Sequence, residues 1–117
     1  MLENDDMQIA KETSGPQTIY KLKDAELDEA LGEAVVSEIE SEFRLHGIFV
    51  KPEFRGKGYG KLIMNAVLRE VHTKRVTLCT GFGNIVFFKR FGFEVIDVGD
   101  SLVSMEKKPV NSKFLSS

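Results

Sequence analysis

Three glycines and several basic residues lie close together near the middle of the 117-residue sequence. Glycine lets a backbone approach a ligand closely and turn its N–H groups inward, and lysine or arginine adds positive charge. A helix that begins directly after such a loop contributes its dipole, so the arrangement suits the binding of a phosphate group. The residues concerned are Gly56, Gly58 and Gly60, with Lys51, Arg55, Lys57 and Lys61 around them.

The spacing of this loop excludes two common phosphate-binding motifs. A P-loop has the form G-x-x-x-x-G-K followed by Ser or Thr, whereas here Arg55 stands at the first glycine position and Leu62 follows Lys61. A dinucleotide-binding loop has the form G-x-G-x-x-G with an acidic residue about 20 positions later, and this loop is G-x-G-x-G without that residue. On its own the loop is therefore a weak signal, and a plain glycine turn explains it as well.

The pattern of apolar residues around the loop predicts the elements that position it. Residues 44–50 form an apolar-rich segment ended by Pro52, which predicts a strand before the loop. After the loop, apolar residues recur at helical spacing, so a helix is expected from about residue 60 to residue 72. The remaining expected elements are strands at 18–22, 75–80, 93–98 and 102–107 and a short helix at 84–91 that ends at Gly92.

Residues 24–43 allow two interpretations. Apolar residues at positions 27, 31, 34, 35 and 39 fit a helical stripe, with Asp24 as its N-cap. Gly32 inside this stripe and the apolar run that follows at 34–36 instead favour a strand over residues 32–39. Periodicity alone leans slightly towards the helix.

The composition is that of one globular domain. A chain of 117 residues has room for a single core, and 42% hydrophobic with 29% charged residues is ordinary for such a domain. Cys79 is the only cysteine, so no internal disulfide can form, and no apolar run approaches the roughly 20 residues of a membrane span. Because the N-terminus is acidic, unlike a signal peptide, we expect a cytoplasmic protein. We expect residues 17–108 to form the domain, with flexible segments at 1–16 and 109–117.

Charge is distributed unevenly along the chain, although the net charge is only −2. Residues 1–43 contain 12 acidic and 3 basic residues, whereas residues 44–90 contain 2 acidic and 10 basic ones. This asymmetry is typical of an acidic segment beside an anion-binding half, and for any single residue a solvated surface charge is the simpler interpretation. The near-neutral total and the lack of an exposed set of aromatic stacking residues argue against a nucleic-acid partner.

Two segments of the chain resemble the signature motifs of the GNAT acetyltransferase superfamily. The family's V-x-P-x-x-[RQ]-x-x-G-x-[GA] segment is similar to Val50-x-Pro52-x-x-Arg55-x-x-Gly58-x-Gly60. Its N…F-Y-x-x-x-G-F segment is similar to Asn84 and the run Phe87-Phe88-Lys89-Arg90-Phe91-Gly92-Phe93, about thirty residues later. With their flanks the segments span roughly residues 44–98, and the combination is much more specific than either motif alone.

The resemblance implies that the chain binds acetyl-CoA. In the family, the loop and the helix N-terminus hold the pyrophosphate of CoA through main-chain N–H groups, and residues 55–61 supply that loop here. The family's fourth strand pairs with the pantetheine arm, and a splayed fifth strand, here 76–80, forms the other wall of the slot. The implied cofactor-binding residues are Ile48, Phe49, Val50, Arg55, Gly56, Lys57, Gly58, Tyr59, Gly60, Lys61, Asn84, Phe87 and Phe88.

The resemblance also implies a fold. It is the α/β (α+β) GNAT fold, a mixed, mostly antiparallel sheet with a splayed central strand pair and flanking helices. The family places a two-stranded hairpin before its fourth strand, which favours a strand over residues 32–39, with the helix as the alternative. The family usually has two helices before these strands, and only about 17 residues are available for them here. We therefore expect a trimmed member without some of the usual acceptor-site walls.

Acetyl transfer from a thioester to an amine requires a neutral amine, donors for the oxyanion and an exit for the thiolate. Main-chain N–H groups of the splayed strand near residues 49–50 are the expected donors. His46 lies where some family members carry a histidine that works through water, and an imidazole titrates in the right range for a base. A half-buried strand position explains His46 equally well, and Glu40 and Glu42 are rival bases. Phe88 replaces the tyrosine that usually serves as the acid, and it cannot donate a proton.

The sequence thus predicts an acetyl-CoA-dependent N-acetyltransferase, an acyltransferase acting on a primary amine of a small molecule, a peptide lysine or an N-terminus. The acidic front half, with Glu38, Glu40 and Glu42, favours a cationic acceptor such as a polyamine, a lysine or an aminoglycoside. The alternative is a non-catalytic acyl-CoA binding or sensing module of the same fold, which Phe88 and the missing front helices support. No metal, nucleic acid or membrane is expected to bind, and a homodimer is compatible with the sequence.

Overall fold

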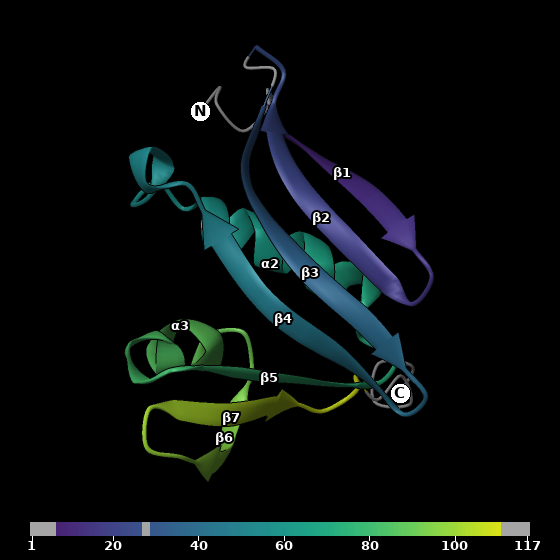
Figure 1. Cartoon of the computed structure of the whole chain (residues 1–117), viewed down its shortest axis with the longest axis vertical. Helices are drawn as coiled ribbons and strands as arrows, with labels where there is room; N and C mark the ends of the chain where they lie inside the picture. The colour runs from purple at the N-terminus through teal and green to yellow at the C-terminus, as the bar shows by residue number, and fades with distance from the viewer. Residues whose placement is uncertain (1–6, 27–28, 111–117) are drawn as a thin grey trace, which may run out of the picture.

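The computed structural model describes residues 7–26 and 29–110, which form one seven-stranded sheet with two α-helices (Figure 1). The strand order is β1-β2-β3-β4-β5-β7-β6, and all neighbours are antiparallel except β4 and β5. This is the mixed, mostly antiparallel sheet that the sequence predicts. The elements are β1 (Met7–Ser14), β2 (Gln17–Asp24), β3 (Ala30–Ile39), β4 (Glu42–Val50), η1 (Pro52–Phe54), α2 (Tyr59–Glu70), β5 (Arg75–Gly81), η2 (Phe82–Asn84), α3 (Ile85–Lys89), β6 (Glu94–Val98) and β7 (Leu102–Lys107).

Both α-helices pack on the same face of the sheet. Buried side chains of α2 and α3 join one core with alternate residues of β2, β3, β4, β5 and β7. The two helices also touch, because a Cβ added to Gly60 of α2 would lie 3.6 Å from the ring of Phe87 of α3. The buried core consists of Tyr20, Leu22, Ala34, Val36, Leu45, Ile63, Met64, Val67, Val71, Val76, Leu78, Phe88, Phe93, Val103 and Met105.

The opposite face, here called the open face, carries the residues that alternate with the core. They include Lys21, Glu33 and Cys79, which are half-buried or exposed. Because α2 and α3 both lie on the core side, no helix in the described part of the chain covers the open face. A tight turn at Gly15 (φ +57°) and Pro16 joins β1 directly to β2.

Strands β4 and β5 separate after a short parallel contact. The pairs run from Glu42 with Arg75 to Arg44 with Thr77, and within the described residues the two strands pair no further. Figure 1 shows them diverging from this point, β4 towards the upper left and β5 towards the left. This is the predicted splayed pair. Among residues 7–26 and 29–110, no strand pairs with the edge of β4 beyond Arg44 on the β5 side.

Two local features fix β4 against β3. A Cβ at Gly32 of β3 would lie 2.6 Å from the carbonyl oxygen of Phe49, so the close approach of the strands requires glycine. The register also shifts where β4 passes Val35 and Val36, which leaves His46 as an extra residue on β4. A bulge of this kind bends a strand and increases its twist, here directly after β4 parts from β5.

The structure decides between the two interpretations of residues 24–43. Ala30–Ile39 is a strand, which confirms the strand expected over 32–39, and the helical alternative is wrong. Asp24 caps no helix, since its Oδ1 accepts the N–H of Glu26 at 2.8 Å in a turn. Apolar residues occupy both faces of β3, and this two-sided pattern resembles a helical stripe. Position 27 of that stripe lies outside the described residues.

The prediction of a flexible segment at 1–16 is wrong for Met7–Ser14, which forms the edge strand β1. Met7 and Ile9 pack against the core, whereas Gln8 and the residues from Ala10 to Ser14 are polar or small. An edge strand with one solvated face is polar enough to resemble a tail, which explains the error. The other residues predicted to be flexible lie mostly outside the described part of the chain.

The helix ends agree closely with the sequence pattern. Helix α2 ends two residues before the expected limit, at Glu70. After α3, Gly92 has a φ of +95°, and the N–H groups of Gly92 and Phe93 bond to the carbonyls of Lys89 and Phe88, as in a glycine-terminated helix. None of the helices in the described chain combines the length and apolar character needed to cross a membrane.

Candidate functional site

The glycine loop between η1 and α2 presents bare backbone to solvent. Gly56 and Gly58 have φ angles of +81° and +84°, a conformation that favours glycine. A Cβ at either position would have no neighbour within 4 Å, so the space beside the loop is open. Helix α2 begins at Tyr59, and the Leu62 N–H bonds to the Gly58 carbonyl at 3.2 Å. The N–H groups of residues 59–61 precede the first internal helix bond, so they point towards any anion held by the loop.

Arg55 is held at the end of β4. Its Nε donates to the Val50 carbonyl at 2.7 Å, and its guanidinium carbon lies 5.4 Å from the centre of the Phe49 ring. The side chain therefore links the loop to the strand and keeps a positive charge at the loop's edge. Arg55, Lys61 and Arg90 all line an outer hollow of about 340 Å³ beside the glycines, here called the loop hollow.

A cleft of about 720 Å³ opens where β4 and β5 separate. Strands β4 and β5 form its walls, α3 lies along it, and the glycine loop stands at its outer end. Its side chains are mostly aliphatic and aromatic, and Arg55 and Cys79 are the two ionisable ones among the described residues that line it. The lining consists of Leu45, Gly47, Ile48, Phe49, Val50, Arg55, Gly56, Gly60, Leu78, Cys79, Thr80, Asn84, Phe87 and Phe88.

The cleft brings together nine of the 13 residues that the sequence singles out for cofactor binding. Gly58, Tyr59 and Lys61 line the loop hollow instead, and Lys57 is exposed in the loop and lines neither space. The sequence did not indicate Leu45 and Gly47 in the cleft, or Phe54 and Arg90 in the loop hollow. The charge of Arg90 inside the second motif was a usable signal, whereas no local pattern marks Gly47.

Asn84 and Phe88 shape the inner part of the cleft. Asn84 Nδ2 donates to Thr80 Oγ1 at 3.0 Å, which ties the end of β5 to the start of α3. Phe88 is 6% exposed, and its ring makes edge contacts with Phe87 and Phe93 at centroid distances of 5.1 and 5.8 Å. A phenyl ring donates no proton, so this position supplies packing and an apolar wall.

His46 lies beside the cleft rather than in it. It is exposed as the extra residue of β4, and its Nε2 lies 2.7 Å from Ser37 Oγ of β3. It lines a recess of about 220 Å³ with Glu33, Val35, Gly47, Ile48 and Phe49. The residues at 47–49 line the cleft as well, so the recess and the cleft meet along β4.

The two rival glutamates are also outside the cleft. Glu42 accepts hydrogen bonds from Thr77 Oγ1 at 2.7 Å and Arg75 Nη1 at 3.3 Å, and Arg44 Nη2 lies 3.6 Å away. Both carboxylate oxygens are thus engaged where β4 and β5 pair, and Glu42 braces the two strands. Glu40 is exposed in the turn between β3 and β4.

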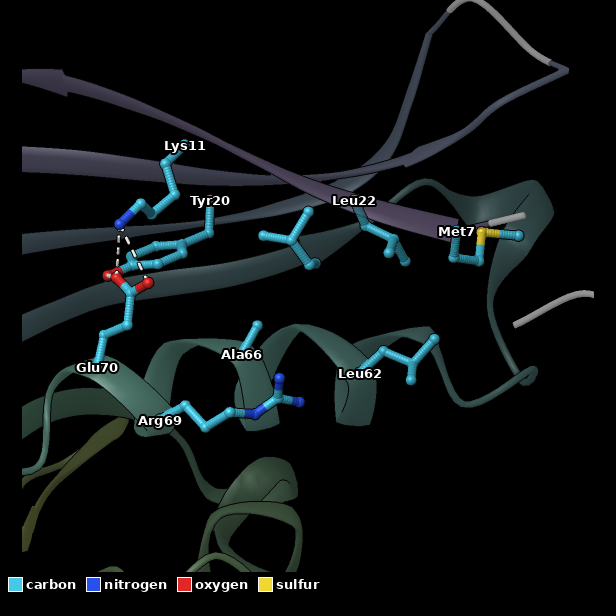
Figure 2. Close-up of a pocket in the computed structure, with 9 residues that line it drawn as sticks. Met7, Lys11, Tyr20, Leu22, Leu62, Ala66, Arg69 and Glu70 are labelled. Carbon is cyan, nitrogen blue, oxygen red and sulfur yellow. Dashed lines mark hydrogen bonds and ion pairs between the residues drawn. The ribbon is translucent and has the colours of Figure 1, made fainter. Parts of the chain in front are cut away.

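A second cavity of about 290 Å³ lies between α2 and strands β1 and β2 (Figure 2). At one end, Glu70 receives the Lys11 amine and the Tyr20 hydroxyl, each at 3.0 Å. Burial is the main cause that raises the pKa of Tyr20, and the hydrogen bond to Glu70 and the charge of Glu70 add to it. The hydrogen bond from Lys11 lowers the pKa of Glu70. Lys11, Tyr20 and Glu70 therefore form hydrogen bonds with one another, and these bonds link α2 to the edge of the sheet. The larger cleft, with its bare loop, is the better candidate site.

The sequence matches one described family and one curated relative. Residues 16–95 match the model of the acetyltransferase (GNAT) domain. Over 71 residues the chain is 39% identical to an uncharacterized N-acetyltransferase of Methanocaldococcus jannaschii, a match that covers 55% of this chain and 31% of the relative. The matched region thus spans about a third of that relative's length.

Solved structures of N-acetyltransferases share the fold. PaiA N-acetyltransferase from Thermoplasma acidophilum, in complex with coenzyme A, superposes with a TM-score of 0.68 at 23% identity, over 80% of this chain and 61% of that one. The ribosomal-protein-S18-alanine N-acetyltransferase from Escherichia coli superposes with a TM-score of 0.71 at 14% identity, over 85% and 74%. At these identities the likeness concerns the fold alone. Because the family model spans residues 16–95, well over half of the chain, this protein belongs to the GNAT acetyltransferase family.

Proposed function

We propose that the protein is an acetyl-CoA-dependent N-acetyltransferase that moves an acetyl group to a primary amine. The observation that carries this proposal is the cleft between the splayed strands, which ends at a loop of bare backbone. Apolar walls suit the pantetheine arm and the acyl group, and a basic end lined by N–H groups suits a pyrophosphate. Membership of the GNAT family supports the same function.

The residues present fit acetyl-CoA as a substrate. The glycine loop and the N–H groups of residues 59–61 would hold the pyrophosphate, and Arg55, Lys61 and Arg90 would add positive charge. The unpaired edge of β4 beyond Arg44 offers N–H and C=O groups to the amides of the pantetheine arm, as it would to an added strand. Main-chain N–H groups on the same edge can stabilise the oxyanion.

During transfer, the amine nitrogen bonds to the acetyl carbon while the bond between that carbon and sulfur breaks. The amine attacks as the neutral base, so a proton must leave it. We assign this proton to the imidazole of His46, acting through one water, because His46 adjoins Gly47, where the recess meets the cleft. The hydrogen bond to Ser37 holds the ring in this place.

The leaving sulfur departs without a tyrosine beside it, since Phe88 occupies that position. A thiol with a pKa of about 8.5 is a tolerable leaving group as the thiolate, so the phenylalanine is compatible with turnover. Cys79 lines the same cleft and is the candidate for a proton donor there. The guanidinium Nη1 of Arg44 lies 3.9 Å from its sulfur.

A non-catalytic acyl-CoA binding module is the second candidate function. The observation in its favour is that no carboxylate or imidazole among the described residues lines the cleft, and Phe88 replaces the acid. Such a module would use the same loop and the same edge of β4 to hold the ligand, and it would lack turnover.

Calorimetry with acetyl-CoA and an assay of thiol release with a panel of primary amines test both candidates together. Binding of acetyl-CoA with amine-dependent release of CoA supports the transferase. Tight binding without release for any amine favours the binding module. Failure of the intact chain to bind acetyl-CoA would overturn both.

A further inference from the structure

The recess on the open face is placed to receive the acceptor. It has a volume of about 220 Å³ and shares Gly47, Ile48 and Phe49 with the cleft. The loop and α2 lie on the core side of the sheet, so acetyl-CoA would enter from that side. An acceptor that approaches from the opposite side meets the recess first, because no helix in the described chain covers the open face.

Glu33 gives the recess its charge. It is half-buried, and within residues 7–26 and 29–110 its carboxylate has neither a hydrogen-bond nor an ion-pair partner. Its cross-strand neighbour Lys21 donates instead to Glu12 at 3.1 Å. The side chain of Phe49 stands directly opposite Glu33 on β4 and is 51% exposed, so an aromatic wall lies beside the carboxylate. Because the Arg55 guanidinium already lies 5.4 Å from the centre of this ring, Glu33 supplies the attraction for an ammonium group and Phe49 supplies an apolar wall.

Other glutamates of this region are already neutralised. Glu38 receives Lys74 at 2.8 Å, and Glu42 is engaged by Arg75 at 3.3 Å. Two of the three residues on which the sequence based its expectation of a cationic acceptor are therefore paired. Glu33, which the sequence did not single out, carries the negative charge that faces the recess.

The strand register sets the distance between the two ends of an acceptor. Val35 of β3 pairs with Gly47, where the recess meets the cleft, and Glu33 lies two residues before Val35 on the same strand. Two residues of a strand span about 7 Å, a length similar to that of a five-carbon chain. An acceptor can therefore place its reacting amine near Gly47 and His46 and a second ammonium group at Glu33.

We propose that the recess is the acceptor subsite and that it selects primary amines which carry a second cationic group about five carbons away. This inference rests on the proposed transferase function. Glu33 is the specificity-determining residue, Phe49 and Val35 flank the carbon chain, and His46 stands beside the reacting amine.

Three probes that differ only in their distal group test this subsite: 1,5-diaminopentane, 1-aminopentane and 5-aminopentanoate. In the intact chain, kcat/KM for 1,5-diaminopentane should exceed that for 1-aminopentane by about tenfold, and 5-aminopentanoate should be the poorest acceptor. Glu33→Gln should remove this advantage, so that kcat/KM for 1,5-diaminopentane falls to that for 1-aminopentane in the same variant. The matched control Glu38→Gln, on the same strand and paired with Lys74, should keep the wild-type preference.

Equal kcat/KM values for 1,5-diaminopentane and 1-aminopentane would overturn the subsite and leave the transferase function intact. A preference for 1,5-diaminopentane that survives Glu33→Gln would do the same. If no probe is acetylated, binding of 1,5-diaminopentane is followed by saturation-transfer NMR. A signal lost in Glu33→Gln but kept in Glu38→Gln would support the recess while the transferase function fails. No signal with the wild-type chain would overturn the recess as well.

Discussion

At the scale of single residues, the proposed chemistry depends on a histidine that lies outside the cleft. His46 is the extra residue of β4, and the bulge places it in the recess on the open face, next to Gly47, where the recess meets the cleft. Its hydrogen bond with Ser37 fixes the ring, whereas Glu42 is occupied by Thr77 and Arg75. Replacement of His46 and replacement of Glu42 should therefore have different effects on activity and stability.

Replacing His46 by alanine should lower turnover about 10²–10⁴-fold, as expected for the loss of a general base. The affinity for acetyl-CoA, measured by calorimetry, should change little, because the side chain does not line the cleft. The acidic limb of the pH–rate profile should also disappear, since it would report the imidazole losing its proton.

Glu42→Gln is the control for this experiment. It should lower the urea midpoint by weakening the contact between β4 and β5, yet keep the acidic limb of the profile. Full activity and an unaltered profile in His46→Ala would remove the histidine from the mechanism.

At the scale of elements, the glycine loop can be tested with a matched pair of glycines. Gly58 and Gly15 both have positive φ, at +84° and +57°, and a Cβ at either meets nothing within 4 Å. Replacement by alanine should therefore lower the stability of the folded chain by a similar amount at each position, on the order of 1 kcal/mol, because of backbone strain. Gly58→Ala should in addition weaken acetyl-CoA binding about tenfold, because main-chain contacts to the pyrophosphate are lost. Calorimetry showing equal affinities for the two variants would contradict the assignment of the loop.

The contact between α2 and the β1–β2 hairpin makes stability depend on pH. The pKa of Tyr20 is raised by burial and by Glu70, so the folded chain holds the phenolic proton more tightly than the unfolded chain does. This contribution is fully present below the unfolded pKa of about 10 and is lost as the pH rises above it. Urea midpoints of the wild type should therefore fall above about pH 10, more steeply than those of Tyr20→Phe. Tyr59→Phe should retain the wild-type slope.

The second half of the fold could be predicted because its signals are local. The glycine loop, the helical spacing after it and the stop at Gly92 are each encoded within a few neighbouring residues. Strand β1 could not be predicted from the sequence. Its polar residues face solvent at the edge of the sheet, and its pairing with β2 produces no periodic pattern of apolar residues. Glu33 was missed for a similar reason. Its place in the recess depends on the register of β3 against β4, which the bulge at His46 shifts.

At the scale of the whole molecule, the sheet consists of two parts joined by little backbone pairing. Strands β1–β4 and β5–β7 share the short contact at Glu42–Arg44, and the core beneath them provides the remaining connection. A ligand in the cleft would touch both parts, because the cleft is lined by β4 on one side and by β5 and α3 on the other.

Acetyl-CoA should therefore stabilise the chain as a whole. At about 100 times its dissociation constant, a ligand that binds the folded state alone adds about 2.7 kcal/mol. For a chain of this size we expect the melting temperature to rise by roughly 10 °C, which differential scanning fluorimetry can measure. Gly58→Glu, with a negative charge in the loop, should show no rise. If the melting temperature of Gly58→Glu rose as much as that of the wild type, acetyl-CoA would have to bind away from the glycine loop.

The turn at Gly15 and Pro16 has a practical consequence. Both residues are exposed, and Figure 1 shows the β1–β2 hairpin at the far side of the sheet from the loop that precedes α2. Exposed turns tolerate inserted segments well. A fluorescent reporter inserted between Ser14 and Gly15 would leave both the cleft and the open-face recess accessible. An attachment tag inserted at the same point would fix the chain to a surface by its hairpin. Pairs of acyl donors and amines could then be screened on the immobilised chain.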